Sequence, residues 1–212
     1  MKERNITVTL NKAKEWFNSG DATLKEIALQ AFDKDELVCN FKNITTFKEA
    51  CEALGLNYDI ISIVTKDVAT FSKASSAMFK LNIIRKALNL GQNLHLTQSA
   101  KSFYPYNPLV TESSTYFKSE LSSGEMEVIG KIKSKGEEYN ILGGCAGYGS
   151  HAGLGNFSSY DGVGAANADI GFLGCTNEEI AQHFGKYFGM LITEAKYADM
   201  VYFEIIENKY AQ

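Results

Sequence analysis

Two residues that could form a catalytic pair, Cys145 and His151, lie six positions apart, and Asp161 follows ten positions later. A thiolate becomes a nucleophile when a histidine within hydrogen-bond distance takes its proton, and a carboxylate can orient that histidine. The glycine-rich sequence around these residues permits such a geometry without specifying it. A thiol-dependent hydrolase that uses Cys145 and His151, with Asp161 as the third candidate, is therefore one hypothesis, and cysteines that only pack in the interior are the alternative.

Cys175 is the second candidate thiol, because it lies just before a predicted helix whose dipole would lower its pKa.

The string Gly147-Tyr-Gly149-Ser-His-Ala152 has the spacing of a dinucleotide-binding fingerprint, but Gly153-Leu-Gly155-Asn follows where that motif needs a helix N-terminus. The histidines are isolated from one another and from any cysteine pair: His95, His151 and His183. The sequence therefore predicts no metal site and no cofactor.

Glycine and aromatic residues gather in one part of the chain. Of the 18 glycines, ten lie between Gly143 and Gly174. Aromatic rings on a surface of small residues bring contact area at low entropic cost. The candidate binding residues are Tyr148, Phe157, Tyr160 and Tyr106. These rings are expected either to contact a protein or carbohydrate partner or to fill the core of a small β unit.

Lysines recur every seven residues at Lys66, Lys73 and Lys80, on a helix predicted over residues 66–89. They would form a basic face, which is either a solvated surface or a docking site for an acidic partner, as in a host-directed inhibitor protein. Residues 93–212 carry 8 basic and 14 acidic groups, so nucleic-acid binding is not expected there.

Helices are predicted over most of the first 92 residues. One helix spans residues 11–19, and Asp21 caps a second whose apolar face includes Leu24, Ile27, Ala28 and Ala31. Thr46 and Glu49 have capping-box spacing and open a helix that ends at Gly55. The β-branched run 60–64 precedes the predicted helix over residues 66–89.

The rest of the chain predicts strands and one more helix. Residues 93–124 form an aromatic connector with turns, and its two prolines each disfavour a helix at the preceding residue. Met126, Val128, Gly130 and Ile132 alternate on one face of a strand that returns after a turn at 134–136 as a second strand over 139–142. Thr176 and Glu179 repeat the capping-box spacing before an amphipathic helix over residues 177–197, and residues 200–206 are an edge-strand candidate.

These elements predict an α+β fold: a helical region over 1–92, the connector over 93–124, and a glycine-rich antiparallel β unit with its C-terminal helix over 125–212. The two regions fold either as separate units or around one shared core. The 212 residues are 45% apolar with a net charge of −4, and no apolar run is long enough to cross a bilayer. No secretory signal is evident, so a cytoplasmic or virion-associated protein is expected.

Three segments carry a resemblance: residues 12–32, residues 46–55 and residues 174–188. Together they resemble a group of uncharacterised proteins carried by phages, prophages and mobile elements of gut anaerobes. The resemblance implies a virion-associated or accessory protein, and it brings no catalytic residue. The leading expectation is a non-enzymatic binding or structural component that contacts a protein or glycan, or assembles with itself, through the glycine and aromatic residues.

Overall fold

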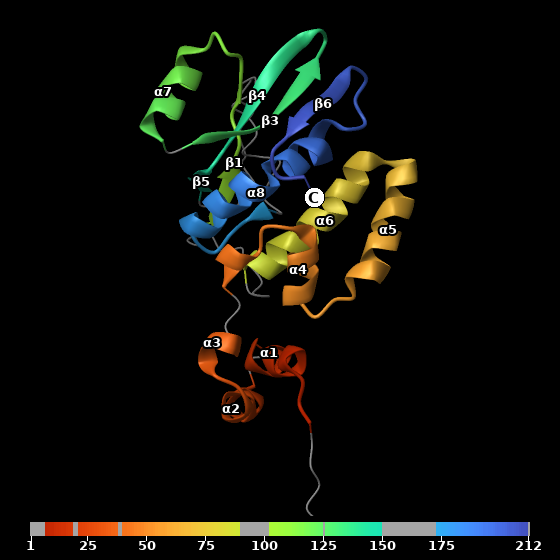
Figure 1. Ribbon diagram of the computed structural model, residues 1–212, viewed down its shortest axis with the longest axis vertical. Coiled ribbons are helices and arrows are strands. Elements are labelled where there is room, and N and C mark those ends of the chain that lie inside the picture. Colours follow the sequence, from red (N-terminus) through yellow and green to blue (C-terminus); the bar gives the residue numbers. More distant parts are fainter. Residues whose placement is uncertain are drawn as a thin grey trace, which may run out of the picture.

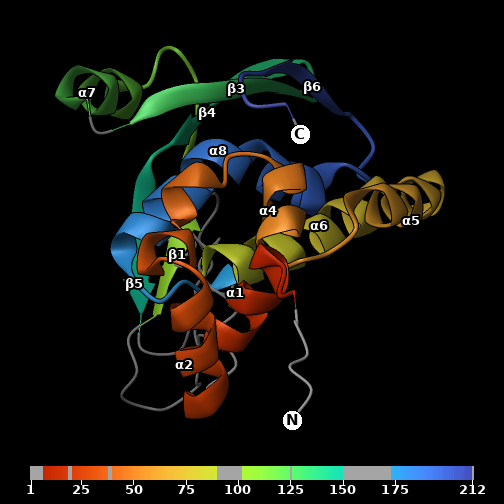
Figure 2. The ribbon, with the colours of Figure 1, turned by 60° about the horizontal axis from the view of Figure 1, so that its bottom comes forward.

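The computed structural model describes residues 7–18, 21–37, 40–89, 102–124, 126–149 and 173–211, and three layers make up its larger part. An antiparallel sheet is the first layer, the long helix α8 (Glu178–Tyr197) is the second, and helices α4 (Phe47–Ala53), α5 (Tyr58–Phe71) and α6 (Lys73–Leu88) are the third. Figure 2 shows α8 beneath the sheet, with α4 and α6 on its other side. The fold class is α+β, as predicted.

The first three helices, α1 (Leu10–Asn18), α2 (Ala22–Ala31) and α3 (Lys34–Leu37), pack on one another at the bottom of Figure 1. Their small core contains Ala13, Ala28 and Leu37. Asp21 caps α2 as predicted, because its carboxylate accepts hydrogen bonds from the backbone N–H groups of Thr23 and Leu24. The predicted apolar face of α2 is only partly buried, since Ile27 and Ala31 are exposed.

The predicted capping box at the start of α4 is confirmed. The backbone N–H of Glu49 donates to Thr46 Oγ1 at 3.2 Å, and that of Thr46 donates to Glu49 Oε2 at 2.9 Å. A short 3₁₀ helix, η1 (Phe41–Asn43), precedes the cap. Gly55 follows α4 with a φ of 68°, a left-handed conformation that glycine adopts without strain.

The single long helix predicted over residues 66–89 is wrong, because the structure has two helices there. α5 contains the β-branched run 60–64, and the chain leaves the helix at Ser72, whose φ and ψ are −154° and 116°. Ser72 then caps α6 by accepting from the backbone N–H of Ser75 at 2.9 Å. Lys66 therefore lies on α5, whereas Lys73 and Lys80 lie on α6, so the three lysines do not form one helical stripe.

The sheet has four strands in the order β2 (Leu109–Val110), β4 (Glu137–Gly143), β3 (Glu127–Ser134) and β6 (Phe203–Asn208). A separate pair joins β1 (Ser102–Tyr106) to β5 (Cys145–Gly149). The described part of the predicted connector thus contains two strands and α7 (Thr115–Ser123), and it is more regular than predicted. The edge strand expected near 200–206 is confirmed as β6.

The predicted hairpin of β3 and β4 is confirmed, but the predicted single apolar face of β3 is wrong. Lys135 and Gly136 form the turn, both with positive φ. The register shifts between Val128 and Gly130, which is a β-bulge. Ile129 and Ile132 consequently pack on one cluster, while Val128 packs with Met126 on another.

α8 is buried on two sides, which explains why apolar residues surround most of it. Its N-cap is Asn177 rather than Thr176, because Asn177 Oδ1 accepts from the backbone N–H of Ile180 at 2.9 Å. Gly185 and Gly189 are buried on α8, where the sheet and Asn107 approach closely. Among the described residues, none of the helices is long and apolar enough to cross a membrane.

Candidate functional site

The predicted catalytic group is only partly described. Cys145 begins β5 and lies opposite Tyr106 in the β1–β5 register. His151 and Asp161 lie outside the described residues. The thiol-dependent hydrolase with Cys145 and His151 therefore stays a prediction.

Cys175 does not have the reactive character suggested by its place before a helix. The residue is fully buried, and burial raises the pKa of its thiol to about 12 although Arg85 favours the thiolate. Cys51 is also buried, and burial raises the pKa of its thiol. Both groups are protonated at neutral pH and behave as small apolar side chains. No group of three or more His, Cys, Asp or Glu side chains that could hold a metal ion occurs in the described part of the chain.

The predicted aromatic surface is also only partly described. Tyr106 is half-buried in β1, and Tyr148 lies in β5 opposite Phe103. Phe157 and Tyr160 lie outside the described ranges. Contact through these four residues stays a prediction.

The predicted basic face is interrupted by acidic and aromatic groups. Burial raises the pKa of Glu194 on α8, and the positive charges of Lys80 and Lys73 partly counteract that rise. Lys80 Nζ also lies 5.8 Å from the centroid of the Phe47 ring. Lys66 is exposed on the other helix.

The structure instead reveals an exposed apolar surface, which we define as Ile60, Ile63, Val64, Phe71, Met200 and Val201. Four of these side chains lie on α5, with exposed fractions of 60% for Ile60, 61% for Ile63 and 93% for Phe71. The spacing of three and four residues places them on one side of the helix. The opposite side of α5 contains Ile61 and Thr65, which are at least half-buried. α5 is therefore apolar on both sides, and only one of them is covered.

The remaining two side chains belong to the turn between α8 and β6. Asp199 holds this turn against the start of α6, because its carboxylate accepts hydrogen bonds from Ser72 Oγ and from the backbone N–H groups of Lys73 and Ala74. Val201, which follows closely, is 77% exposed. The link at Ser72, the residue after Phe71, holds the turn against the junction of α5 and α6, so exposed apolar side chains from two elements far apart in the sequence lie near this junction.

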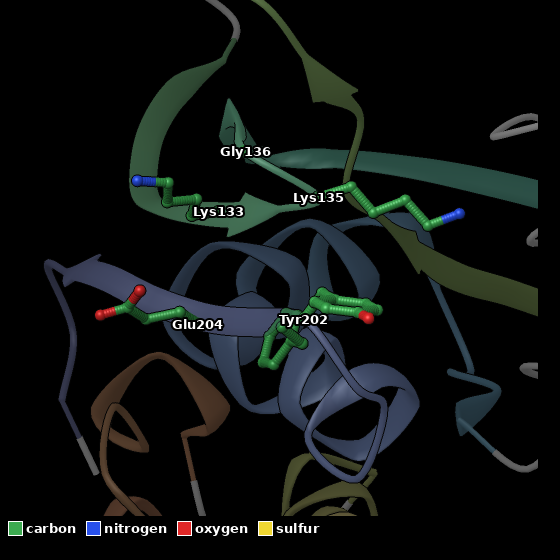
Figure 3. Close-up of a pocket in the computed structure, with 6 residues that line it drawn as sticks. Lys133, Lys135, Gly136, Tyr202 and Glu204 are labelled. Carbon is green, nitrogen blue, oxygen red and sulfur yellow. The ribbon is translucent and has the colours of Figure 1, made fainter.

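An open pocket of about 570 Å³ adjoins this turn. It lies between the tip of the β3–β4 hairpin and the first residues of β6, and its lining residues are Lys133, Lys135, Gly136, Tyr202, Phe203 and Glu204. Figure 3 shows Lys135 and the Tyr202 ring extending to one side, and Lys133 and Glu204 to the other. Tyr202 has a φ of 76°, which is a strained backbone conformation for a tyrosine. The pocket therefore presents both signs of charge around an aromatic ring.

Glu127 on β3 is the centre of a charged cluster that attaches the C-terminal residues to α8. Its carboxylate accepts from Lys186 Nζ at 2.9 Å, from the Tyr210 hydroxyl at 2.8 Å and from Lys209 Nζ. Burial alone would raise the pKa of Glu127, but these hydrogen bonds outweigh it and lower the pKa to about 2. The cluster is thus a structural clamp that requires the ionised carboxylate.

Protonation of Glu127 is expected to loosen this clamp in acid. Because the pKa is lower in the folded state, the stabilisation is complete above the ordinary value of 4.5 and is lost as the pH falls toward about 2. Glu127→Gln should therefore lower the stability at pH 7 and flatten its pH dependence between these limits, as measured by urea unfolding at pH 7, 4 and 3. Glu138→Gln, at an exposed position on β4, is the control. An unchanged slope for Glu127→Gln would contradict the assignment.

His183 on α8 is a structural residue. Its Nε2 lies 2.7 Å from the Ile44 carbonyl oxygen, and its ring contacts those of Phe41 and Tyr187. Burial lowers the pKa of His183, so the neutral ring donates Nε2–H to the carbonyl group. The residue holds η1 on α8, which agrees with a structural rather than a metal-binding role.

Comparisons with protein-family models, with curated proteins and with solved structures find no match to this chain. Function must therefore be inferred from the residues and their arrangement.

Proposed function

We propose that this chain is a non-enzymatic protein-binding component and that it contacts its partner through the apolar surface. The resemblance noted above suggests a virion or accessory protein of a phage or mobile element as its setting. The observation that carries the proposal is the exposure of large apolar side chains on α5 together with those of the α8–β6 turn. The contact surface that this observation supports differs from the glycine and aromatic surface suggested by the sequence.

Exposure of this kind is unfavourable for an isolated protein. Burying one large apolar side chain stabilises a complex by about 1.5–3 kcal/mol before the entropy of association is subtracted. Single exposed apolar residues are ordinary, but a contiguous group marks an interaction site. Phe71 is 93% exposed, so a partner that covers it would bury more apolar area there than at any other side chain of the surface.

The chemistry around the apolar surface favours a protein over other partners. Asp67 lies among its side chains, and Asp59 and Asp199 lie beside it. These three carboxylates outnumber the neighbouring Lys66 and Lys73 and oppose binding to an anionic bilayer or to nucleic acid. A carbohydrate would leave the aliphatic side chains of Ile60 and Ile63 without apolar contacts. A protein surface supplies such contacts.

Site-specific photo-crosslinking tests this proposal. A photo-reactive phenylalanine analogue is introduced at position 63 or 201, and the controls carry it at positions 82 and 118, where Asn82 and Lys118 are exposed. In cells that naturally produce the protein, we expect protein adducts of defined mass from positions 63 and 201 at a yield about tenfold higher than from the controls. Equal yields at all four positions would contradict the proposal.

The apolar surface should contribute to binding without contributing to folding. Phe71→Ser and Val201→Ser are expected to change the free energy of unfolding by less than about 0.5 kcal/mol, because both side chains are already in water. The same substitutions should remove the adducts formed from position 63. Phe47→Ser, at a buried position on α4, is the folding control and should destabilise by about 3–5 kcal/mol. A comparable loss for Phe71→Ser in urea unfolding would show that Phe71 belongs to the core.

A further inference from the structure

We infer that the partner at α5 is a second copy of this chain, and that the two α5 helices pack antiparallel about a two-fold axis. This inference rests on the proposed function, since it names the protein that covers the apolar surface. Figures 1 and 2 both show α5 at the edge of the molecule, with its outer side open.

The pattern of apolar residues on α5 fits a helix–helix seam. Ile60 and Ile63 are three residues apart and are followed by Val64 and, seven residues later, Phe71. The first three residues have the spacing of three and four by which side chains interdigitate between two helices, and Asp67 occupies the next position of the seam. The other side of α5, with Ile61 and Thr65, faces the rest of the chain, so only the outer seam is available to a second molecule.

The charged residues beside the seam select the antiparallel orientation. Asp59 and Lys66 are both exposed and lie seven residues apart, which places them on the same flank of α5 about 10 Å apart along the axis. Neither has an ion pair in the described part of the chain. When two copies pack antiparallel with the two-fold axis between positions 62 and 63, the two identical flanks meet and Asp59 of each copy faces Lys66 of the other. Ile60, Ile63 and Val64 then form the centre of the seam, and Phe71 lies beyond the start of the other copy's α5.

A parallel arrangement lacks this complementarity. There, each flank meets the opposite flank of the partner helix, and Asp59 and Lys66 would face the apolar side chains of Val64 and Phe71. The antiparallel dimer therefore forms two equivalent ion pairs across one interface, whereas the parallel dimer forms none.

The interface is expected to be weak. α5 has 14 residues and is about 21 Å long, so its seam buries less than the roughly 800 Å² per partner of a standard interface. Asp67 lies within the seam and weakens it further, because a charged group there loses water. A dissociation constant in the micromolar to submillimolar range follows.

Charge reversal in the purified full chain tests the arrangement. Asp59→Lys alone places two lysines opposite each other twice, and Lys66→Asp alone does the same with two aspartates. Each single variant should therefore dimerise at least about tenfold more weakly than the natural chain. In an equimolar mixture of the two variants, the mixed dimer has a lysine opposite an aspartate at both contacts between positions 59 and 66. The double variant, which carries both substitutions in one chain, forms the same pairs in its own dimer. Both should recover the natural affinity.

Sedimentation velocity over about 1–500 μM measures these affinities, with circular dichroism to show that each variant is folded. A natural chain that stays monomeric throughout, or a mixture that dimerises no better than its components, would overturn the antiparallel dimer. The crosslinks from position 63 show whether only the dimer is wrong or whether the proposed protein-binding function is wrong as well. Adducts at twice the 23.4 kDa chain mass support the dimer, adducts to a different protein refute the dimer and keep the binding function, and the absence of adducts refutes both.

Discussion

Replacing Asn89 by alanine is expected to destabilise the protein by about 2–4 kcal/mol. Asn89 is buried after the last residue of α6, and its Nδ2 donates to the carbonyl oxygens of Arg85 at 2.8 Å and Gly174 at 3.2 Å. Its Oδ1 accepts from the backbone N–H of Thr176 at 2.8 Å. The substitution removes the side-chain partner of the buried Gly174 carbonyl and of the part-buried Thr176 N–H, and a buried group that loses its partner costs more than the hydrogen bond contributes. The Arg85 carbonyl still accepts from the backbone N–H of residue 89.

Asn82 provides a matched control on the same helix. Its side chain is exposed and makes one hydrogen bond, from Nδ2 to the Met78 carbonyl oxygen. Asn82→Ala should change the free energy of unfolding by less than about 0.5 kcal/mol, because water replaces the amide and alanine favours the helix. Chemical unfolding of both variants measures the difference, and equal effects would show that Asn89 does not join α6 to the segment before α8.

Replacing Gly189 by valine is expected to destabilise the protein by at least about 3 kcal/mol. Gly189 lies on α8, where a Cβ atom would overlap Nδ2 of Asn107 and Cδ1 of Ile129. Asn107 cannot withdraw without cost, because its Nδ2 donates to the carbonyl oxygens of Leu142 and Gly185. The larger side chain would therefore separate α8 from the sheet.

Gln182→Val on the same helix is the control, because it introduces the low helix propensity of valine without the overlap at position 189. Gln182 is half-buried and makes only a weak contact with Glu178, so its substitution should cost less than about 1 kcal/mol. The destabilisation by Gly189→Ala should lie between those of Gly189→Val and Gln182→Val, since the methyl group favours the helix but still overlaps Asn107. Thermal and urea unfolding give the three values, and a stable Gly189→Val variant would contradict the close packing of α8.

The elements that could be predicted are those determined by neighbouring residues. The capping box at Thr46 and Glu49, the cap at Asp21 and the turn at Lys135 and Gly136 depend on contacts within four residues, and the sequence displays them. The helix break at Ser72 has a local signal, since Ser72 accepts from the N–H of Ser75, but the apolar spacing continues across it. Asp199, which also accepts from two backbone N–H groups at the start of α6, lies more than 120 residues away in the sequence. The bulge at Ile129 likewise depends on how β3 pairs with its neighbours.

The apolar surface left a signal that sequence reasoning did not use. The β-branched run 60–64 predicts that a helix starts after it, although the same residues also place apolar side chains on two sides of a helix that starts earlier. Asn89 left no such signal, because its partners Gly174 and Thr176 are distant in sequence. The predicted group of Cys145, His151 and Asp161 was argued from spacing alone and stays a prediction.

The central claim is that the apolar surface is a protein contact, and the photo-crosslink from position 63 tests it most directly. The account predicts protein adducts from position 63 at about ten times the yield from position 118, and their loss in the Phe71→Ser variant. Equal yields from positions 63 and 118, or adducts that persist in Phe71→Ser, would contradict it.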